Sequence, residues 1–205
     1  EHSEDDDRAH LRDLRRFFAD PRYVRVEGRP LFLVYRPSRL PDPRRTAAVW
    51  REEAARAGLP GLHLCGVESF FEDRAGPEAY GFDAAVEFQP DWANLGEPLT
   101  HPAFGRHRVH DYGAFVAAQL AKPGAPYRRY PCVTPRWDNS ARRPGDALIL
   151  FNPDPEAYAR WLAAALRGRR SRPRDERLVF INAWNEWGEG CHLEPDLVAG
   201  RMWLE

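Results

Sequence analysis

One junction in the chain, at residues 178–196, constrains the fold more than any other feature. Four consecutive apolar residues, 178–181, lie between an arginine-rich segment and a stretch of Asn, Trp, Glu and Gly. A short unbroken apolar run is typical of a strand buried on both faces of a parallel sheet. In parallel α/β proteins, the groups that carry chemistry follow the carboxyl ends of the strands. The sequence therefore predicts an α/β fold with Glu186 and Glu189 at the mouth of a sheet or barrel.

Glu186 and Glu189 are three residues apart, and Gly188 and Gly190 beside them allow the backbone to turn. Two carboxyl groups in one small volume are the catalytic groups of most enzymes that cleave glycosidic bonds. Their separation is about 5 to 5.5 Å in retaining enzymes and about 6.5 to 9.5 Å in inverting enzymes, and the spacing in the sequence does not choose between them. The alternative is that both glutamates are solvated loop residues, because bare motif matches are often accidental.

Two tryptophans, Trp184 and Trp187, flank the glutamates. Their flat apolar rings suit the C–H face of a sugar, and the alternative is that both are core residues. Trp50 and Trp161 lie on the apolar faces of predicted helices, and we expect them in the core. Three histidines between residues 100 and 111 have no triad or metal spacing, and we expect them at the surface: His101, His107 and His110.

Periodicity along the rest of the chain predicts alternating helices and strands. Apolar side chains recur on one helical face at residues 5–20, 46–57, 112–120 and 154–166. Short apolar runs predict strands at residues 31–35, 62–67, 84–88, 130–135 and 178–181. The first of these strands follows a hairpin turn at Glu27 and Gly28. This alternation indicates a parallel arrangement, and the aperiodic residues 93–110 are predicted to form a long loop.

Candidate binding groups stand at the ends of several predicted strands. Tyr35 and Arg36 end one strand, Glu87 lies in another, and Trp137 and Asp138 follow a third. An aromatic ring beside a carboxylate suits a sugar, which offers both hydroxyl groups and a flat face. The alternatives are that Arg36 pairs with a neighbouring carboxylate and that Asp138 caps a turn. Alternation along a strand leaves the direction of Glu87 open.

The composition excludes several classes of protein. The formal net charge is -1 and arginines are spread along the chain, so we expect no nucleic-acid partner. No segment approaches the roughly 20 apolar residues of a membrane span. Three irregularly spaced cysteines indicate reduced thiols and a cytoplasmic location. Neither a metal nor another cofactor is expected, because Cys191 and His192 have no further ligand at metal spacing and no glycine-rich phosphate-binding turn is present.

The string NAWNEWGEG at residues 182–190, followed by LEPD at 193–196, resembles the signature of the glycoside hydrolase family 99-like proteins, also called WbsX-like proteins. The resemblance extends upstream through residues 20–37, 81–90 and 137–143. It covers nearly the whole chain in the same order. Members of this family have a (β/α)8 TIM barrel, and the chain is similar to roughly the last five strands of that barrel with their helices.

The resemblance implies that residues 1–205 belong to a single domain of this family whose N-terminal strands are missing, and that the substrate is a carbohydrate. By motif position, Glu186 would assist the substrate 2-hydroxyl as a base, and Glu189 would serve as acid and base on the glycosidic oxygen. The candidate substrate-binding residues are Tyr35, Arg36, Glu87, Trp137, Asp138, Trp184, Asn185, Trp187 and Glu194.

Three functions stay open at this point. Hydrolysis of cell-surface polysaccharide or mannose-type glycans has the best motivation, because the roles that the resemblance implies for the two glutamates are those of a glycoside hydrolase. WbsX-like members are associated with bacterial polysaccharide and O-antigen gene clusters, which make lipopolysaccharide, and are often described as glycosyltransferases. Transfer to another sugar is therefore one alternative, and a non-catalytic glycan-binding module is the other.

Overall fold

The structure is a computed structural model that describes residues 3–205. The chain forms two compact units. Unit 1 contains residues 3–87, 125–130 and 172–178, and unit 2 contains residues 88–124, 131–171 and 179–205. Among residues 3–205, no helix combines the length and the apolar character that a membrane crossing requires.

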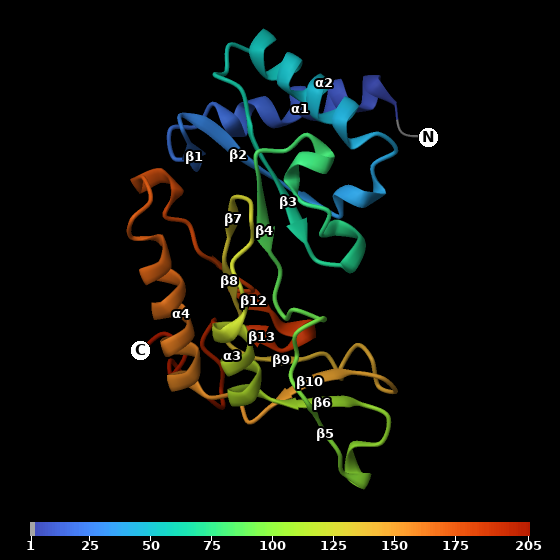
Figure 1. Ribbon diagram of the computed structural model, residues 1–205, viewed down its shortest axis with the longest axis vertical. Helices are drawn as coiled ribbons and strands as arrows, with labels where there is room; N and C mark the ends of the chain where they lie inside the picture. The colour runs from blue at the N-terminus through green and yellow to red at the C-terminus, as the bar shows by residue number, and fades with distance from the viewer. Residues whose placement is uncertain (1–2) are drawn as a thin grey trace. The chain divides into compact units, whose positions relative to one another are not determined.

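Unit 1 is built on a five-stranded sheet with the order β1-β2-β3-β4-β7 (Figure 1). β1 and β2 form the predicted antiparallel hairpin, and Glu27 and Gly28 between them have φ of 53° and 74°. Positive φ at both central residues is the geometry of a two-residue hairpin turn. The other neighbouring strands run parallel, as predicted. The strands are β1 (Arg25–Val26), β2 (Arg29–Tyr35), β3 (His63–Glu68), β4 (Ala84–Glu87) and β7 (Arg129–Tyr130).

Two helices of unit 1, α1 (Glu4–Phe18) and α2 (Pro43–Arg56), pack against each other (Figure 1). The side chains of Ser3 and Asp42 accept hydrogen bonds from the first turns of α1 and α2, which satisfies amides that have no helical partner. Trp50 is 5% exposed, so its predicted core position is confirmed. Its cluster of buried residues includes Leu11, Phe18, Val34, Ala54, Leu62, Leu64, Tyr80 and Phe82.

Unit 2 contains a mixed four-stranded sheet with the order β5-β6-β10-β9. Its central strands β6 and β10 are parallel, and the outer strands are antiparallel to them. The core of this unit includes Phe115, Val133 and Trp161, and Trp161 is buried as predicted. The elements are β5 (Pro98–Leu99), β6 (Arg108–Asp111), α3 (Tyr112–Ala121), β9 (Trp137–Asp138), β10 (Leu148–Phe151) and α4 (Pro155–Arg169).

The structure corrects two expectations in unit 2. Residues 93–110 do not form a single loop, because β5 lies within them and β6 begins there. β6 pairs with β10 about forty residues further along the chain, so no local periodicity announces it. His110 lies in β6 and is only 6% exposed, with Nδ1 3.1 Å from the carbonyl oxygen of Gly96, so the expectation of a surface histidine is wrong. The buried Val109 beside it explains why this segment joins the sheet.

The strand predicted at residues 130–135 is divided into two. β7 ends at Tyr130 in unit 1, and β8 (Cys132–Val133) belongs to unit 2. Pro131 lies between them and has no N–H group to donate to a sheet, although its carbonyl oxygen accepts a hydrogen bond from Phe180. The three cysteines Cys65, Cys132 and Cys191 are free and buried.

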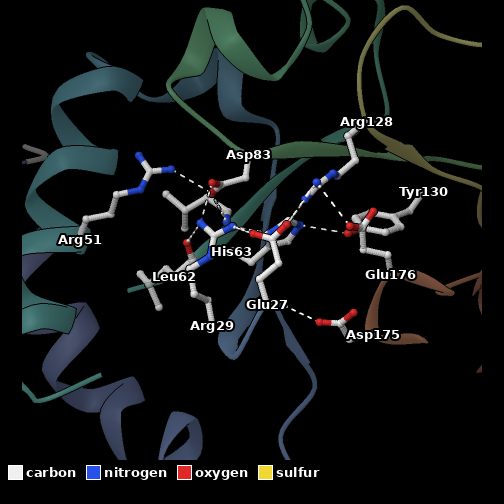
Figure 2. Close-up of polar contacts among 11 residues, drawn as sticks. Glu27, Arg29, Arg51, Leu62, His63, Asp83, Arg128, Tyr130, Asp175 and Glu176 are labelled. Carbon is white, nitrogen blue, oxygen red and sulfur yellow. Dashed lines mark hydrogen bonds and ion pairs between the residues drawn. The ribbon is translucent and has the colours of Figure 1, made fainter. Parts of the chain in front are cut away.

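A polar network connects the elements of unit 1 at the end of the sheet where the parallel strands begin (Figure 2). Asp83, immediately before β4, accepts hydrogen bonds from Arg29 at 2.8 Å, from Arg51 at 2.9 Å and from the backbone N–H of Leu64 at 2.9 Å. One carboxylate therefore joins β2, α2 and β3.

The same network fixes residues 172–178 to the hairpin. Arg128 lies 3.2 Å from Glu27 and 3.4 Å from Glu176 (Figure 2). The backbone N–H of Glu27 donates to Asp175 at 2.6 Å. These contacts connect the hairpin turn at Glu27 and Gly28 with Arg128 and with Asp175 and Glu176. They hold the turn, whose two residues have positive φ, in a fixed position.

The substitution Asp83→Asn is expected to lower the free energy of unfolding by about 2 to 3 kcal/mol at neutral pH, because it removes the half-buried charge that pairs with both Arg29 and Arg51. Burial raises the pKa of Asp83, but hydrogen bonds from Arg29 and Leu64 and the charge of Arg51 outweigh it and hold the pKa below its usual value. Stability from a lowered carboxyl pKa is present above the unfolded pKa of about 4 and is lost as the pH falls through the folded value. Denaturant titrations from neutral to acidic pH should show the difference shrinking.

Asp146→Asn is the matched control. Its side chain is 66% exposed and pairs with Arg143 at 3.0 Å, so its removal should change stability by less than about 0.5 kcal/mol. Equal denaturation midpoints for Asp83→Asn and the unmodified protein at neutral pH would contradict the role given to Asp83.

Candidate active site

The predicted catalytic segment is a short hairpin in unit 2. β11 (Phe180–Ile181) runs parallel to β8, and β12 (Asn185–Glu186) then pairs antiparallel with β13 (Cys191–His192). The tip of the hairpin is the 3-10 turn η6 (Trp187–Glu189). Glu186 therefore ends a strand and Glu189 ends the turn that follows it. A turn of the backbone between the two glutamates is confirmed.

The burial predicted for the strand before this hairpin is wrong. Ile181 is 39% exposed, although an unbroken apolar run predicts a strand buried on both faces. In the described part of the chain β11 pairs only with β8, so one of its edges has no neighbouring strand.

Gly190 allows the hairpin to approach the segment that follows β8. Its φ is +61°, and a Cβ added there would lie 2.8 Å from the carbonyl oxygen of Asp138. Gly188 is also confined, because a Cβ would lie 3.1 Å from Cδ of Arg142 and 3.2 Å from Oε1 of Glu186. Gly190 is thus needed both for this close packing against backbone atoms and for its backbone conformation, whereas the atoms nearest to Gly188 belong to flexible side chains.

This close approach brings Arg142 against both glutamates. Its Nη1 atom lies 3.1 Å from Oε1 of Glu189 and 4.0 Å from Oε1 of Glu186. Because both distances are measured from the same nitrogen, the two Oε1 atoms lie no more than about 7 Å apart. This upper limit is compatible with the separation of about 5 to 5.5 Å in retaining enzymes and with only the shortest separations in inverting enzymes. The structure therefore brings the two predicted catalytic residues into one small volume.

The two carboxyl groups have different surroundings. The Glu189 side chain is 25% exposed and that of Glu186 is 46% exposed. Burial raises the pKa of Glu189, the charge of Arg142 opposes this, and the charge of Glu186 adds to it, so that the pKa is raised overall. A carboxyl group with a raised pKa retains its proton at higher pH, which is the requirement for a general acid.

Two predicted binding residues beside the glutamates are half exposed: Trp184 at 51% and Trp187 at 49%. Trp187 stacks on His192 with ring centroids 3.7 Å apart, and its Nε1 donates to Glu194 at 2.9 Å. Asn185 is exposed on β12. These four predicted residues, Trp184, Asn185, Trp187 and Glu194, belong to the same hairpin or to the chain directly beside it.

Trp137 and Asp138 differ in their exposure. Trp137 is 1% exposed and packs edge to face against Trp92, with ring centroids 5.5 Å apart, so its ring is part of the core of unit 2. Asp138 is exposed and accepts a hydrogen bond from the backbone N–H of Ser140 at 2.9 Å. This bond is the one expected if Asp138 caps a turn, which was the alternative to sugar binding. The atoms of Asp138 nearest to Gly190 of the hairpin are its backbone atoms and its Cβ, and not its carboxylate.

The remaining predicted site residues, Tyr35, Arg36 and Glu87, belong to unit 1. Tyr35 is 59% exposed at the end of β2. The guanidinium of Arg36 lies 3.9 Å from the ring centre of Phe70, and its Nε is 3.9 Å from the Asp73 carboxylate. Glu87 forms an ion pair at 3.4 Å with Arg129. Arg36 and Glu87 thus both have charged partners within unit 1.

Sequence reasoning missed the residues that organise this hairpin. Arg142 lies within the matched string at 137–143, which was the signal available for it. His192 is buried and lies 3.0 Å from Asp196, and Arg136 contacts both of them. Within residues 3–205 there is no group of three or more His, Cys, Asp or Glu side chains that could hold a metal ion.

Comparison with solved structures defines the class of fold. A glycoside hydrolase-like protein has a TM-score of 0.66 at 13% identity, over 97% of this chain and 58% of that one. Two structures of the GH99 endo-α-mannosidase from Bacteroides thetaiotaomicron, one in complex with BIS-TRIS-propane, have TM-scores of 0.55 and 0.54 at 20% and 22% identity. They cover 95% of this chain and 56% and 53% of those chains. The fold is a partial (β/α)8 barrel with a curled sheet, as predicted.

The family is shown by the sequence as a whole. Residues 1–205 match the family model described as Glycosyltransferase WbsX, and the chain belongs to this family. Two proteins named "Uncharacterized protein WxcX", from two strains of Xanthomonas campestris pv. campestris, are each 41% identical over 210 residues. The match covers 100% of this chain and 30% of each relative, so the chain spans under a third of the relatives' length.

Replacement of Gly190 by alanine should lower the free energy of unfolding by about 2 to 4 kcal/mol. The new Cβ meets the backbone of Asp138, and a left-handed conformation is costly for any residue with a side chain. Thermal and denaturant unfolding measure the change. Gly168→Ala is the control, and its effect should have the opposite sign. Gly168 lies in α4, and no atom lies within 4 Å of the position that a Cβ would take. Alanine favours the helix over glycine, so the free energy of unfolding should rise by about 0.5 to 1 kcal/mol.

Arg142→Gln should raise the pKa of Glu189 further, because the positive charge that opposes its protonation is removed. Glu186→Gln should lower that pKa, because a like charge is removed. NMR titration of the ¹³C-labelled glutamate carboxyl groups measures both changes. Arg143→Gln is the control, since Arg143 pairs with Asp146 instead. A Glu189 titration that is the same in all four proteins would show that the three groups are not coupled.

Proposed function

We propose that the chain carries the acid and base groups of a glycan-processing enzyme, with hydrolysis of a glycosidic bond as its reaction. The observation that carries the proposal is the pair Glu186 and Glu189, joined by Arg142 and differing in exposure. Family membership and the barrel fold support a carbohydrate substrate. Two half-exposed indole rings beside the pair offer faces for sugar stacking.

Each glutamate has its own role in this proposal. Glu189 is the less exposed and has the raised pKa, so it donates its proton to the glycosidic oxygen as the bond to the sugar carbon breaks. Glu186, the more exposed of the two and 4.0 Å from Arg142, accepts a proton from the attacking group, either the sugar's own 2-hydroxyl or a water molecule. If water attacks, the proton ends on Glu186 instead of Glu189, and exchange with solvent resets the pair. If the 2-hydroxyl attacks, the anhydrosugar that forms is opened by water: Glu189 takes a proton from that water, and Glu186 returns its proton to the sugar oxygen.

The proposed substrates are mannose-type glycans or cell-surface polysaccharides. Support comes from the solved GH99 endo-α-mannosidases, which share the fold, and from the hydrogen-bonding groups beside the indole rings. Asn185, Glu194 and Asp138 of unit 2 are proposed to bind sugar hydroxyls. Tyr35, Arg36 and Glu87 belong to unit 1, and for them sugar binding stays a prediction from the sequence. Trp137 is left out of this proposal because its ring is enclosed in the core.

Transfer of the sugar to another hydroxyl is the second candidate reaction. The description of the family as a glycosyltransferase favours it, and a role in bacterial lipopolysaccharide or other polysaccharide biosynthesis would accompany it. The same two carboxyl groups would serve, with a sugar hydroxyl in place of water. Chromatography of products formed with and without an added acceptor sugar separates the two reactions.

We also propose that the chain is one part of a single barrel domain and that the protein is cytoplasmic. The structural relatives contain nearly the whole chain within 53% to 58% of their own length, which supports the first point. Three free, buried cysteines support a reducing compartment.

Glu189→Gln should reduce turnover of α-linked mannooligosaccharides at least about 100-fold, because it removes the proton donor. Affinity for the same oligosaccharides should change little, because glutamine keeps the shape and hydrogen-bonding capacity of the side chain. Release of reducing sugar measures turnover, and calorimetry measures binding.

Glu156→Gln serves as the control, because the Glu156 side chain on α4 is 89% exposed. Binding without turnover in both the unmodified protein and Glu189→Gln would instead identify a glycan-binding module. Undiminished turnover in Glu189→Gln would remove Glu189 from the mechanism.

A further inference from the structure

Trp187 directly follows Glu186 in the chain and is held at two places. Its indole ring stacks on the imidazole of His192, with centroids 3.7 Å apart and planes 25° apart. Its Nε1 donates to Glu194 at 2.9 Å. A ring stacked at this distance has one face covered, and Trp187 is still 49% exposed. The exposed surface of the indole therefore belongs to its other face and its edges.

His192 is itself fixed from behind. It is 7% exposed, and its Nε2 lies 3.0 Å from the carboxylate of Asp196. Arg136 contacts that carboxylate and the same ring nitrogen. The Nδ1 atom of His192 is buried and has no hydrogen-bond partner among the described residues. The ring is thus anchored at one nitrogen, and its flat face packs against Trp187.

Asp196 provides a rigid end for this series of contacts. It accepts hydrogen bonds from the backbone N–H groups of Val198 at 2.8 Å and Ala199 at 2.6 Å. The Ala199 N–H, Arg136 and His192 hold the pKa of Asp196 well below its usual range, so it is a charged anchor. Arg136 lies over the Trp203 ring, 5.5 Å from its centre, which fixes the guanidinium in turn.

We infer that His192, anchored by Asp196 and Arg136, is the positioning residue that makes Trp187 a one-faced platform for a pyranose ring. The identity of the ligand in this inference, a sugar with an apolar C–H face, rests on the proposed function. A tryptophan fixed before binding loses less side-chain freedom when a sugar stacks on it, and this raises affinity. Glu194 sets the rotation of the ring through Nε1, and His192 sets its tilt.

The test of the positioning role does not require activity. The full chain is labelled with 5-fluorotryptophan, and the Trp187 resonance is assigned by its absence in Trp187→Phe. His192→Ala should shift this resonance by more than its line width, and His192→Gln should do the same while it keeps a group that can reach Asp196. His192→Phe, which restores a flat ring, should bring the resonance back towards its original position. Circular dichroism establishes that each variant is folded.

The control is His101→Ala, because His101 is exposed and its ring lies against Phe104 and not against a tryptophan. This substitution should leave the Trp187 resonance in place. An unchanged Trp187 resonance in both His192→Ala and His192→Gln would overturn the positioning role.

The glycan arm uses α-linked mannotriose as the probe. His192→Ala should weaken its binding about five-fold, the cost of ordering one mobile side chain, and His192→Phe should recover most of the loss. If the Trp187 resonance moves but affinity stays the same, the platform role is overturned. If the unmodified chain does not bind mannotriose, the proposed glycan ligand fails, and the fluorine spectra still decide whether His192 orients Trp187.

Discussion

The candidate site depends on one close approach of two backbones. Gly190 lies so near to Asp138 that no Cβ fits between them, and this contact brings the hairpin of Glu186 and Glu189 against the segment that carries Arg142. Because the contact involves main-chain atoms, neither side can move aside by changing a rotamer. The contacts of Arg142 with the two carboxyl groups therefore depend on a position where only glycine is tolerated.

Electrostatics then distinguishes two residues of the same chemical type. Arg142 contacts both carboxyl groups, but Glu189 is less exposed and Glu186 is more solvated. Burial and the charge of Glu186 favour the protonated form of Glu189, and the charge of Arg142 opposes it. Two glutamates three residues apart therefore have different surroundings, which the proposed roles of acid and base require. The exposed indole faces beside them add an apolar surface that suits a sugar.

Local sequence patterns predicted the parts of the fold that local forces determine. The strands of the unit 1 sheet, the positions of Trp50 and Trp161 in the core and the turn between Glu186 and Glu189 were all predictable. β6 was missed because its pairing with β10 is long-range, although the apolar run of β10 was a usable signal. The burial of Trp137 and the position of Arg142 depend on packing between distant segments, which no spacing of residues in the chain reveals.

The free cysteines have a practical consequence for work on this protein. All three are buried, and burial raises the pKa of the Cys65 thiol and raises that of Cys191 to about 12, so these two groups are rarely thiolates at neutral pH. The thiolate is the form that reacts with alkylating reagents. One cysteine introduced at an exposed position would therefore react far faster than the native three. A spin label or fluorophore could then be attached at a single chosen place without removing any natural residue.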